Sequence, residues 1–306
     1  TLQAAKDAWL ASREPYLQTE VYRFYDGPID NEADGPEGLL NAWPMDENYV
    51  DYTTDDPNAG LINDTSFEIT EANLEGANEV GGEKNIATGF HTIEFLLWGQ
   101  DTMENMAGMR PHTDYVTDGT GTAANQDRRG LYLTTCGDLL VKHLQGLHTE
   151  WAADGAYRAT FESAAEDESL EKILTGMIIL AGFETGGERL QAALDSGDRE
   201  DEHSCFSDNT HRDMIQDIQG IHNVYSGTYT RVDGTKVEGV SVKAVVSETD
   251  SALAEKLDTE IADALAKANA LQTPFESEIA PGNTEGNARV QTLIAALRTV
   301  EGTLED

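Results

Sequence analysis

Apolar residues along this chain recur mainly at intervals of three and four, the spacing that places them on one face of a helix. The clearest run holds four apolar residues at strict four-residue intervals: Leu253, Leu257, Ile261 and Leu265. It stops before Thr273-Pro274, where a helix cannot easily continue. The same spacing predicts further long helices over residues 2–25, 128–153, 170–194, 210–227 and 290–304.

Two kinds of segment depart from this pattern. Residues 230–242 (TRVDGTKVEGVSV) carry the only good strand pattern, with Asp233-Gly234 as a hairpin turn. Residues 26–64 and about 99–127 are irregular, and the first is rich in Gly, Pro, Asp and aromatic residues. Loops of this length inside a compact protein tend to be functional. The prediction is an all-α fold of two packed helical bundles of the four-helix type, with long irregular loops and at most one short β-hairpin.

Length supports two units, because 306 residues are more than one domain usually needs. We expect an N-terminal bundle over residues 1–165, which carries the long loops, and a C-terminal bundle over residues 166–306. No apolar run is long enough for a transmembrane helix. Nothing at the start resembles a signal peptide, and the chain begins at Thr1, so we expect that a leader is absent from this sequence.

The net charge of the chain limits the classes of partner that it can bind. The chain has 57 acidic and 20 basic residues, for a formal net charge of -37. Such a field argues against nucleic acid and against anionic membranes as partners, and it favours a solvated surface suited to salty surroundings. The two cysteines, Cys136 and Cys205, either form one disulfide or remain as two buried thiols.

The helix predicted over residues 86–98 is apolar nearly all round, yet it contains the sequence GFHTIEFLLWG. On a helical wheel His91, Glu94 and Trp98 lie within about 60 degrees of one another beside the apolar face. An isolated buried carboxylate would cost several kcal/mol. Glu94 is therefore expected to be protonated or hydrogen-bonded, to pair with a His or Arg, or to share a metal ion with His91. By itself an HxxE pair is weak evidence for a metal, because such pairs are common structural contacts.

The second half contains an echo of this motif. In Gly182-Phe183-Glu184-Thr185-Gly186-Gly187-Glu188 the Gly, Phe and Thr of the first motif recur, and a Glu replaces the His. The echo suggests two related bundles that each present a polar pair to a common interface. Alternatively, Glu184 and Glu188 lie on a solvated helix face beside Arg189.

Residues 200–213 (EDEHSCFSDNTHRD) concentrate imidazole, carboxylate and thiol groups at the predicted start of a helix. Thr210 and Asp213 have the spacing of a capping box. The acidic residues before them form either part of a site or a solvated turn.

Several of these stretches together resemble the imelysin family, and in particular its iron-regulated protein A branch. The resemblance covers about residues 8–230 and rests on REPYLQTEVYRFYDGPID from residue 13, NAWPMDENYVDY from 41, NIATGFHTIEFLLWGQD from 85, RPHTDYV from 110, DRRGLYL from 127, GERLQAALDSGDREDEHSCFSDNTHRD from 187 and QGIHNVY from 219. It implies a bacterial envelope protein, periplasmic or outer-membrane-associated, with two helical bundles, a site between them and a link to iron supply.

The GxHxxE motif of that family falls on Gly89, His91 and Glu94. The resemblance thus implies His91 and Glu94 as ligands of a divalent or trivalent transition metal, with iron favoured over zinc and copper. The ligand could also be a metal chelate or haem. Less certain ligands are chosen because they lie in the stretches that carry the family resemblance: Glu20, Asp46, Glu184, Glu188, Glu202, His203, Asp208 and His211.

Three functions remain open. Members of the family have been classed as metallopeptidases, which would make this chain a zinc peptidase with Glu94 as a catalytic residue. The sequence contains neither HExxH nor HxxEH, since position 95 is Phe, so a distant third histidine such as His203 or His211 would be needed. A non-catalytic protein could instead dock another envelope protein through exposed aromatics of residues 26–64. The third function is the one that we expect: the chain is an exported protein that binds a metal and serves the acquisition of iron or another metal.

Overall fold

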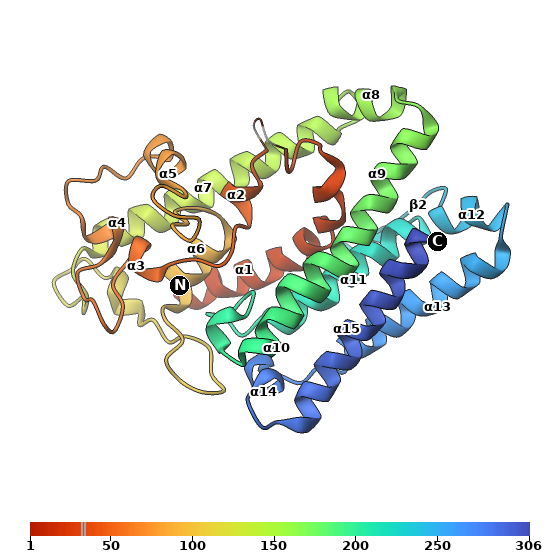
Figure 1. The fold of residues 1–306 in the computed structure, drawn as a ribbon. Helices are drawn as coiled ribbons and strands as arrows, with labels where there is room; N and C mark the ends of the chain where they lie inside the picture. The colour runs from red at the N-terminus through yellow and green to blue at the C-terminus, as the bar shows by residue number, and fades with distance from the viewer. Residues whose placement is uncertain (32, 34) are drawn as a thin grey trace. The chain divides into compact units, whose positions relative to one another are not determined.

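Residues 1–31, 33 and 35–306 are described by a computed structural model, and they form a mostly helical protein (Figure 1). The described residues contain one sheet, which has two strands. The helical fold with at most one short hairpin that the sequence predicts is therefore confirmed. Within the same residues, no helix combines the length and apolarity needed to cross a membrane.

The chain packs as two compact units. Unit 1 comprises Thr1–Trp9 and Gly27–Glu162, and unit 2 comprises Leu10–Asp26 and Ser163–Asp306. Helix α1 (Leu2–Leu17) contributes its first residues to unit 1 and the rest to unit 2. The domains expected at residues 1–165 and 166–306 stay a prediction; the packing described here assigns residues 10–26 to the same unit as the C-terminal half.

Unit 2, all of whose residues are described, is a bundle of long helical segments. The first segment is continuous and consists of α9 (Glu166–Ile178), the π-helical η3 (Ile179–Gln191) and α10 (Ala192–Ser196). The others are α11 (Thr210–Ser226), α13 (Ser251–Ala268) and α15 (Thr284–Glu305). Helix α15 packs against η3 and α13, and α11 packs against α13 and η3. Their apolar faces meet in one core, which is why apolar residues recur every three or four positions.

Shorter elements complete unit 2: η1 (Glu20–Tyr25), η4 (Arg199–Asp201), α12 (Val242–Ser247) and α14 (Phe275–Ile279). Strands β1 (Thr228–Thr230) and β2 (Lys236–Glu238) pair antiparallel, with Thr228 opposite Glu238. Gly234 has a φ of 83° in the connecting turn, a backbone conformation that favours glycine. The predicted hairpin is therefore present, and its first strand begins two residues earlier than the sequence pattern suggests.

Unit 1 is built around α6 (Gly89–Trp98) and α7 (Gln126–Trp151), which pack against each other. Shorter helices complete unit 1: α2 (Glu37–Leu40), α3 (Glu47–Val50), α4 (Gly60–Asn63), α5 (Glu71–Ala77), η2 (His112–Tyr115) and α8 (Ala156–Ser163). Helix α2 also contacts both α6 and α7. The irregular segments therefore belong to the packed body of unit 1.

A buried ionic cluster holds these loops to α7. The Asp51 carboxylate accepts hydrogen bonds from Nε and Nη2 of Arg129, at 2.6 and 2.9 Å, and from Nη1 of Arg110, at 2.7 Å. The two guanidinium groups lie 5.1 and 5.2 Å from the centre of the Tyr52 ring. Both loops and the long helix are thus joined through one carboxylate, which gives the loops a structural role.

Candidate functional site

The start of α6 is fixed by close packing on α2. Gly89, the first helical residue, has a φ of 90°, and a Cβ atom there would lie 2.6 Å from the carbonyl oxygen of Leu40. A side chain at this position would therefore be strained and would clash with the backbone. From α1, the indole Nε1 of Trp9 donates to the carbonyl of Phe90 at 2.9 Å. These contacts explain why glycine precedes the histidine in this motif.

His91 and Glu94 form a buried pair on α6. His91 Nδ1 lies 2.9 Å from Glu94 Oε2, and the two side chains are 1% and 0% exposed. This pairing is one of the three arrangements that burial of Glu94 predicts. When Glu94 is ionised it can only accept this hydrogen bond, and Nδ1 of His91 then carries the proton. Nε2 is then the nitrogen that can bind a metal ion.

Neither Phe95 nor the predicted ligand Asp46 completes a set of metal ligands with this pair. Phe95 follows Glu94, is fully buried and lies 5.2 Å from the guanidinium of Arg110. Asp46 is exposed, and its carboxylate accepts from the backbone N–H of Asn48 as the N-cap of α3. Among the described residues of unit 1, no third His, Cys, Asp or Glu brings a ligand atom within 4.8 Å of both His91 and Glu94.

A second polar cluster lies inside unit 2 around Arg189 of η3. Its guanidinium donates to Glu20 Oε2 at 2.7 Å, to Glu184 Oε1 at 3.0 Å and to Asp217 Oδ2 at 2.8 Å. The structure thus brings two predicted ligands, Glu20 and Glu184, to one cation. Glu188, from the same motif echo, is exposed.

The pKa values of two acids in this cluster, Glu20 and Asp217, are shifted in opposite directions. Burial alone would raise the pKa of Glu20, but the charges of Arg189 and Arg23 lower it to about 2. Burial raises the pKa of Asp217 to about 8, against the opposing charge of Arg189. Asp217 Oδ1 is buried without a hydrogen-bond partner in the part of the chain that the structure describes. Burial thus favours the protonated form of Asp217, while the two arginines favour the ionised form of Glu20.

Asp213 organises a further network at the start of α11. Its Oδ2 accepts from His203 Nδ1 at 2.7 Å, from Arg13 Nη2 at 3.2 Å and from Ser204 Oγ at 2.5 Å. Burial would raise the pKa of Asp213, but the Arg13 charge and the His203 hydrogen bond hold it far below its usual range. The predicted capping box is wrong: Asn209 is the N-cap of α11, and Asp213 points into this network instead.

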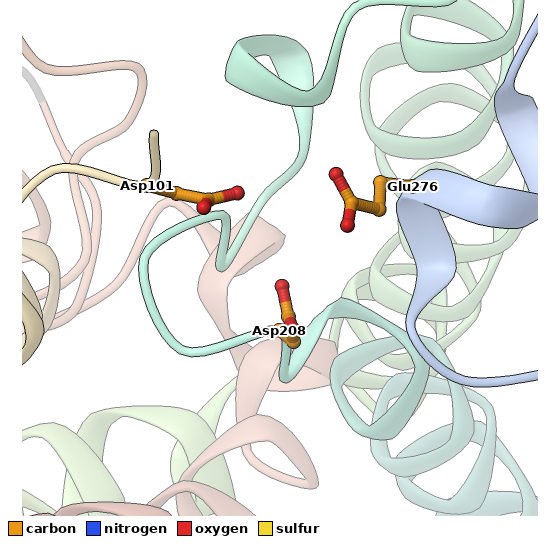
Figure 2. A group of neighbouring side chains, drawn as sticks. All are labelled: Asp101, Asp208 and Glu276. Carbon is orange, nitrogen blue, oxygen red and sulfur yellow. The ribbon is translucent and has the colours of Figure 1, made fainter. Parts of the chain in front are cut away.

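The remaining predicted ligands also belong to unit 2. Glu202 is buried beside His203, and His211 is half-buried, where burial and the charge of Arg212 lower its pKa. Carboxylate oxygens of Asp208 and Glu276, both in unit 2, lie within 4.8 Å of each other (Figure 2). Asp101, the third side chain drawn there, belongs to unit 1.

Some polar residues that shape these clusters were not expected from the sequence. They are Arg13, Asp213 and Asp217 in unit 2, together with the Asp51 group in unit 1. For these residues the sequence gives a signal of burial only on α11, where Asp213 and Asp217 are four residues apart among buried apolar residues. A polar pair on an apolar face must find partners in the interior.

Comparison with known proteins agrees with this fold. A family model described as imelysin matches residues 1–304. Iron-regulated protein A of Synechococcus elongatus is 28% identical over 314 residues, which cover 99% of this chain and 73% of that protein. A crystal structure from Parabacteroides distasonis, of a protein assigned as an iron-regulated protein A precursor, is similar with a TM-score of 0.69 at 18% identity, covering 99% of this chain and 82% of that one. At this identity the likeness extends to the fold alone.

Proposed function

The chain belongs to the imelysin family, and from this premise we propose that it binds a transition metal through His91 and serves iron or metal acquisition in the bacterial cell envelope. The observation that carries the proposal is the buried hydrogen bond of 2.9 Å between His91 and Glu94. The name of the cyanobacterial relative, iron-regulated protein A, supports iron over other metals.

The pair suits a metal because each partner has a chemical task. Imidazole nitrogen binds iron, zinc and copper well, and a carboxylate suits the harder ions among them. A carboxylate on Nδ1 fixes the ring orientation and raises the basicity of Nε2. His91 would therefore be the ligand, and Glu94 would orient it and supply negative charge next to the ion.

One helix cannot complete the coordination. His91 and Glu94 fill at most two of the roughly four to six positions that such ions use. We infer that the metal keeps water or the oxygens of a chelate in other positions, or recruits further residues. Glu20 and Glu184 rank low among those residues, because each would have to leave the guanidinium of Arg189.

Two other functions receive less support. A zinc peptidase needs an open position, a bound water and a general base. Phe95 stands where HExxH-like motifs place a second ligand, and Glu94 is already bonded to His91. Docking through exposed aromatics is also disfavoured, because Trp43, Tyr49 and Tyr52 are all half-buried.

Metal titration of the full chain tests the proposal. We expect metal-free protein to bind Fe(II) or Zn(II) at one equivalent, and His91→Ala to weaken binding by more than the roughly 10–100-fold that loss of an outer-sphere partner costs. Glu94→Gln should weaken binding within that range, since the amide still reaches Nδ1 but carries no charge. His148→Ala, which removes an exposed histidine of unit 1, should bind as the wild type does.

Equal affinity in wild type and His91→Ala would refute the metal site. The peptidase alternative is tested separately by incubating metal-loaded protein with an unfolded polypeptide. Cleavage that a chelator stops and that disappears in Glu94→Ala would overturn our preference for binding without turnover.

A further inference from the structure

Methionines cluster in one exposed segment of unit 1. Three of the six methionines in the chain fall within seven residues, at Met103, Met106 and Met109. Their exposed fractions are 37%, 47% and 62%, whereas Met177 and Met214 are fully buried. Buried methionines fill gaps in a core, but exposed thioethers at a regular three-residue spacing contribute little to packing.

The segment is a closed loop on a rigid base. Residues 99–109, here called the methionine loop, leave the end of α6 and return to it. The backbone N–H of Arg110 donates to the carbonyl of Trp98 at 2.6 Å, and the guanidinium of Arg110 is held by Asp51 at 2.7 Å. At Gly108 a Cβ would lie 2.7 Å from the same Trp98 carbonyl oxygen, so the returning chain is pressed against the helix end.

The loop therefore confines three thioethers to a short span. The backbone N–H of Met103 donates to Asp101 Oδ1 at 3.2 Å, which fixes the first bend. Methionine side chains have three rotatable bonds, so sulfurs three residues apart on a closed loop can turn toward one ion. Glu104 is exposed between the first two methionines, and its charge attracts cations.

Thioether sulfur is a soft ligand, and among common metal ions it selects Cu(I). We propose that the methionine loop is a Cu(I) site in which Met103, Met106 and Met109 supply three sulfur ligands. The site is independent of the proposed function at His91, because it uses none of the same residues and selects a softer ion. The ion arrives as Cu(I) and is bound without a change in oxidation state.

Competition against a chromophoric Cu(I) chelator, under anaerobic and reducing conditions, tests this site on the full chain. Wild-type protein should take up one Cu(I) with sulfur neighbours in the X-ray absorption spectrum. The triple substitution Met103→Leu, Met106→Leu and Met109→Leu should weaken binding by more than about 100-fold, since it removes ligands and not only their supports. Leucine is similar in volume and these positions are exposed, so the far-ultraviolet circular dichroism should be unchanged.

Two single variants are matched controls. Met45→Leu, outside the loop, should keep wild-type Cu(I) affinity. His91→Ala should keep it too, which separates this site from the proposed one even if the latter fails. Both Cys136 and Cys205 remain in the triple variant, so the loss of affinity there reports the thioethers and not the thiols. Wild-type affinity in the triple variant, no stoichiometric Cu(I) uptake by wild type, or only nitrogen and oxygen neighbours would each overturn the inference.

Discussion

Burial strongly changes the acid–base chemistry of Asp217. This acid lies inside unit 2 with Arg189 on one oxygen and no hydrogen-bond partner among the described residues on the other. Its raised pKa, near 8, means that the folded protein holds a proton which the unfolded chain releases near pH 4. Linkage then makes stability depend on pH through this one group.

We predict that Asp217→Asn removes a pH-dependent loss of stability. Between pH 4 and pH 8 the folded state binds one more proton at Asp217 than the unfolded state, so its contribution to the free energy of unfolding falls as pH rises and levels off above about 8. Urea unfolding across this range should show wild type losing a few kcal/mol relative to Asp217→Asn.

The comparison needs a control, because other acids such as Glu20 contribute with the opposite sign. Asp138→Asn changes an exposed acid on α7 and should leave the pH profile of wild type unchanged. If the difference between wild type and Asp217→Asn stays constant from pH 4 to pH 8, Asp217 is ionised in the folded protein.

At the scale of elements, the placement of α6 depends on Gly89. Gly89→Ala should destabilise the protein by about 2–4 kcal/mol, because the new Cβ meets the Leu40 carbonyl in a left-handed backbone conformation. This loss of stability should appear as a lower midpoint of thermal unfolding.

Gly146→Ala provides the matched control within α7. Gly146 is exposed in the interior of that helix, with open space around its Cα, so alanine should stabilise by roughly 1 kcal/mol. Equal effects of the two substitutions would show that the close packing of α6 on α2 is not as described.

The long loops depend on Asp51 in a similar way. Asp51→Asn leaves the guanidinium groups of Arg110 and Arg129 buried without their shared counter-charge, and we predict a loss of about 3–5 kcal/mol in urea unfolding. Lys142→Met, which breaks exposed ion pairs with Glu71 and Glu75, should cost less than about 1 kcal/mol. Similar losses in both variants would remove the structural role assigned to the Asp51 cluster.

Sequence periodicity predicted where helices lie better than it predicted the type of helix. The helices ending near residues 153, 194 and 227 were expected because apolar faces repeat every three or four residues. The π-helical form of η3 was not, because a wider turn leaves almost the same apolar pattern as an α-helix. Asp213 has the spacing of a cap, but in the structure its partners Arg13 and His203 hold it in a buried network.

For the whole molecule, the net charge of -37 predicts self-repulsion that salt should relieve. The Debye length falls from about 10 Å at 0.1 M salt to about 3 Å at 1 M. The thermal midpoint should therefore rise between these concentrations, and equally in NaCl and KCl. A constant or falling midpoint would show that repulsion between surface charges does not limit stability.

The sequence could predict the His91–Glu94 pair of the candidate site because both residues lie on the same helix. His91 and Glu94 lie three residues apart on one helix, so sequence spacing alone brings them together. Partners that are far apart in sequence could not be paired in this way: Glu20 and Arg189 meet across 169 residues, and Arg13 and Asp213 across 200. Only the packing of unit 2 brings them into contact.

Anomalous scattering from crystals of metal-loaded protein tests the central claim most directly. With Fe(II) or Zn(II) bound, a peak at the absorption edge of the metal should lie about 2.0–2.2 Å from Nε2 of His91. Crystals of His91→Ala prepared in the same way should lack it. A loaded protein whose anomalous peaks all lie away from His91 would contradict the account.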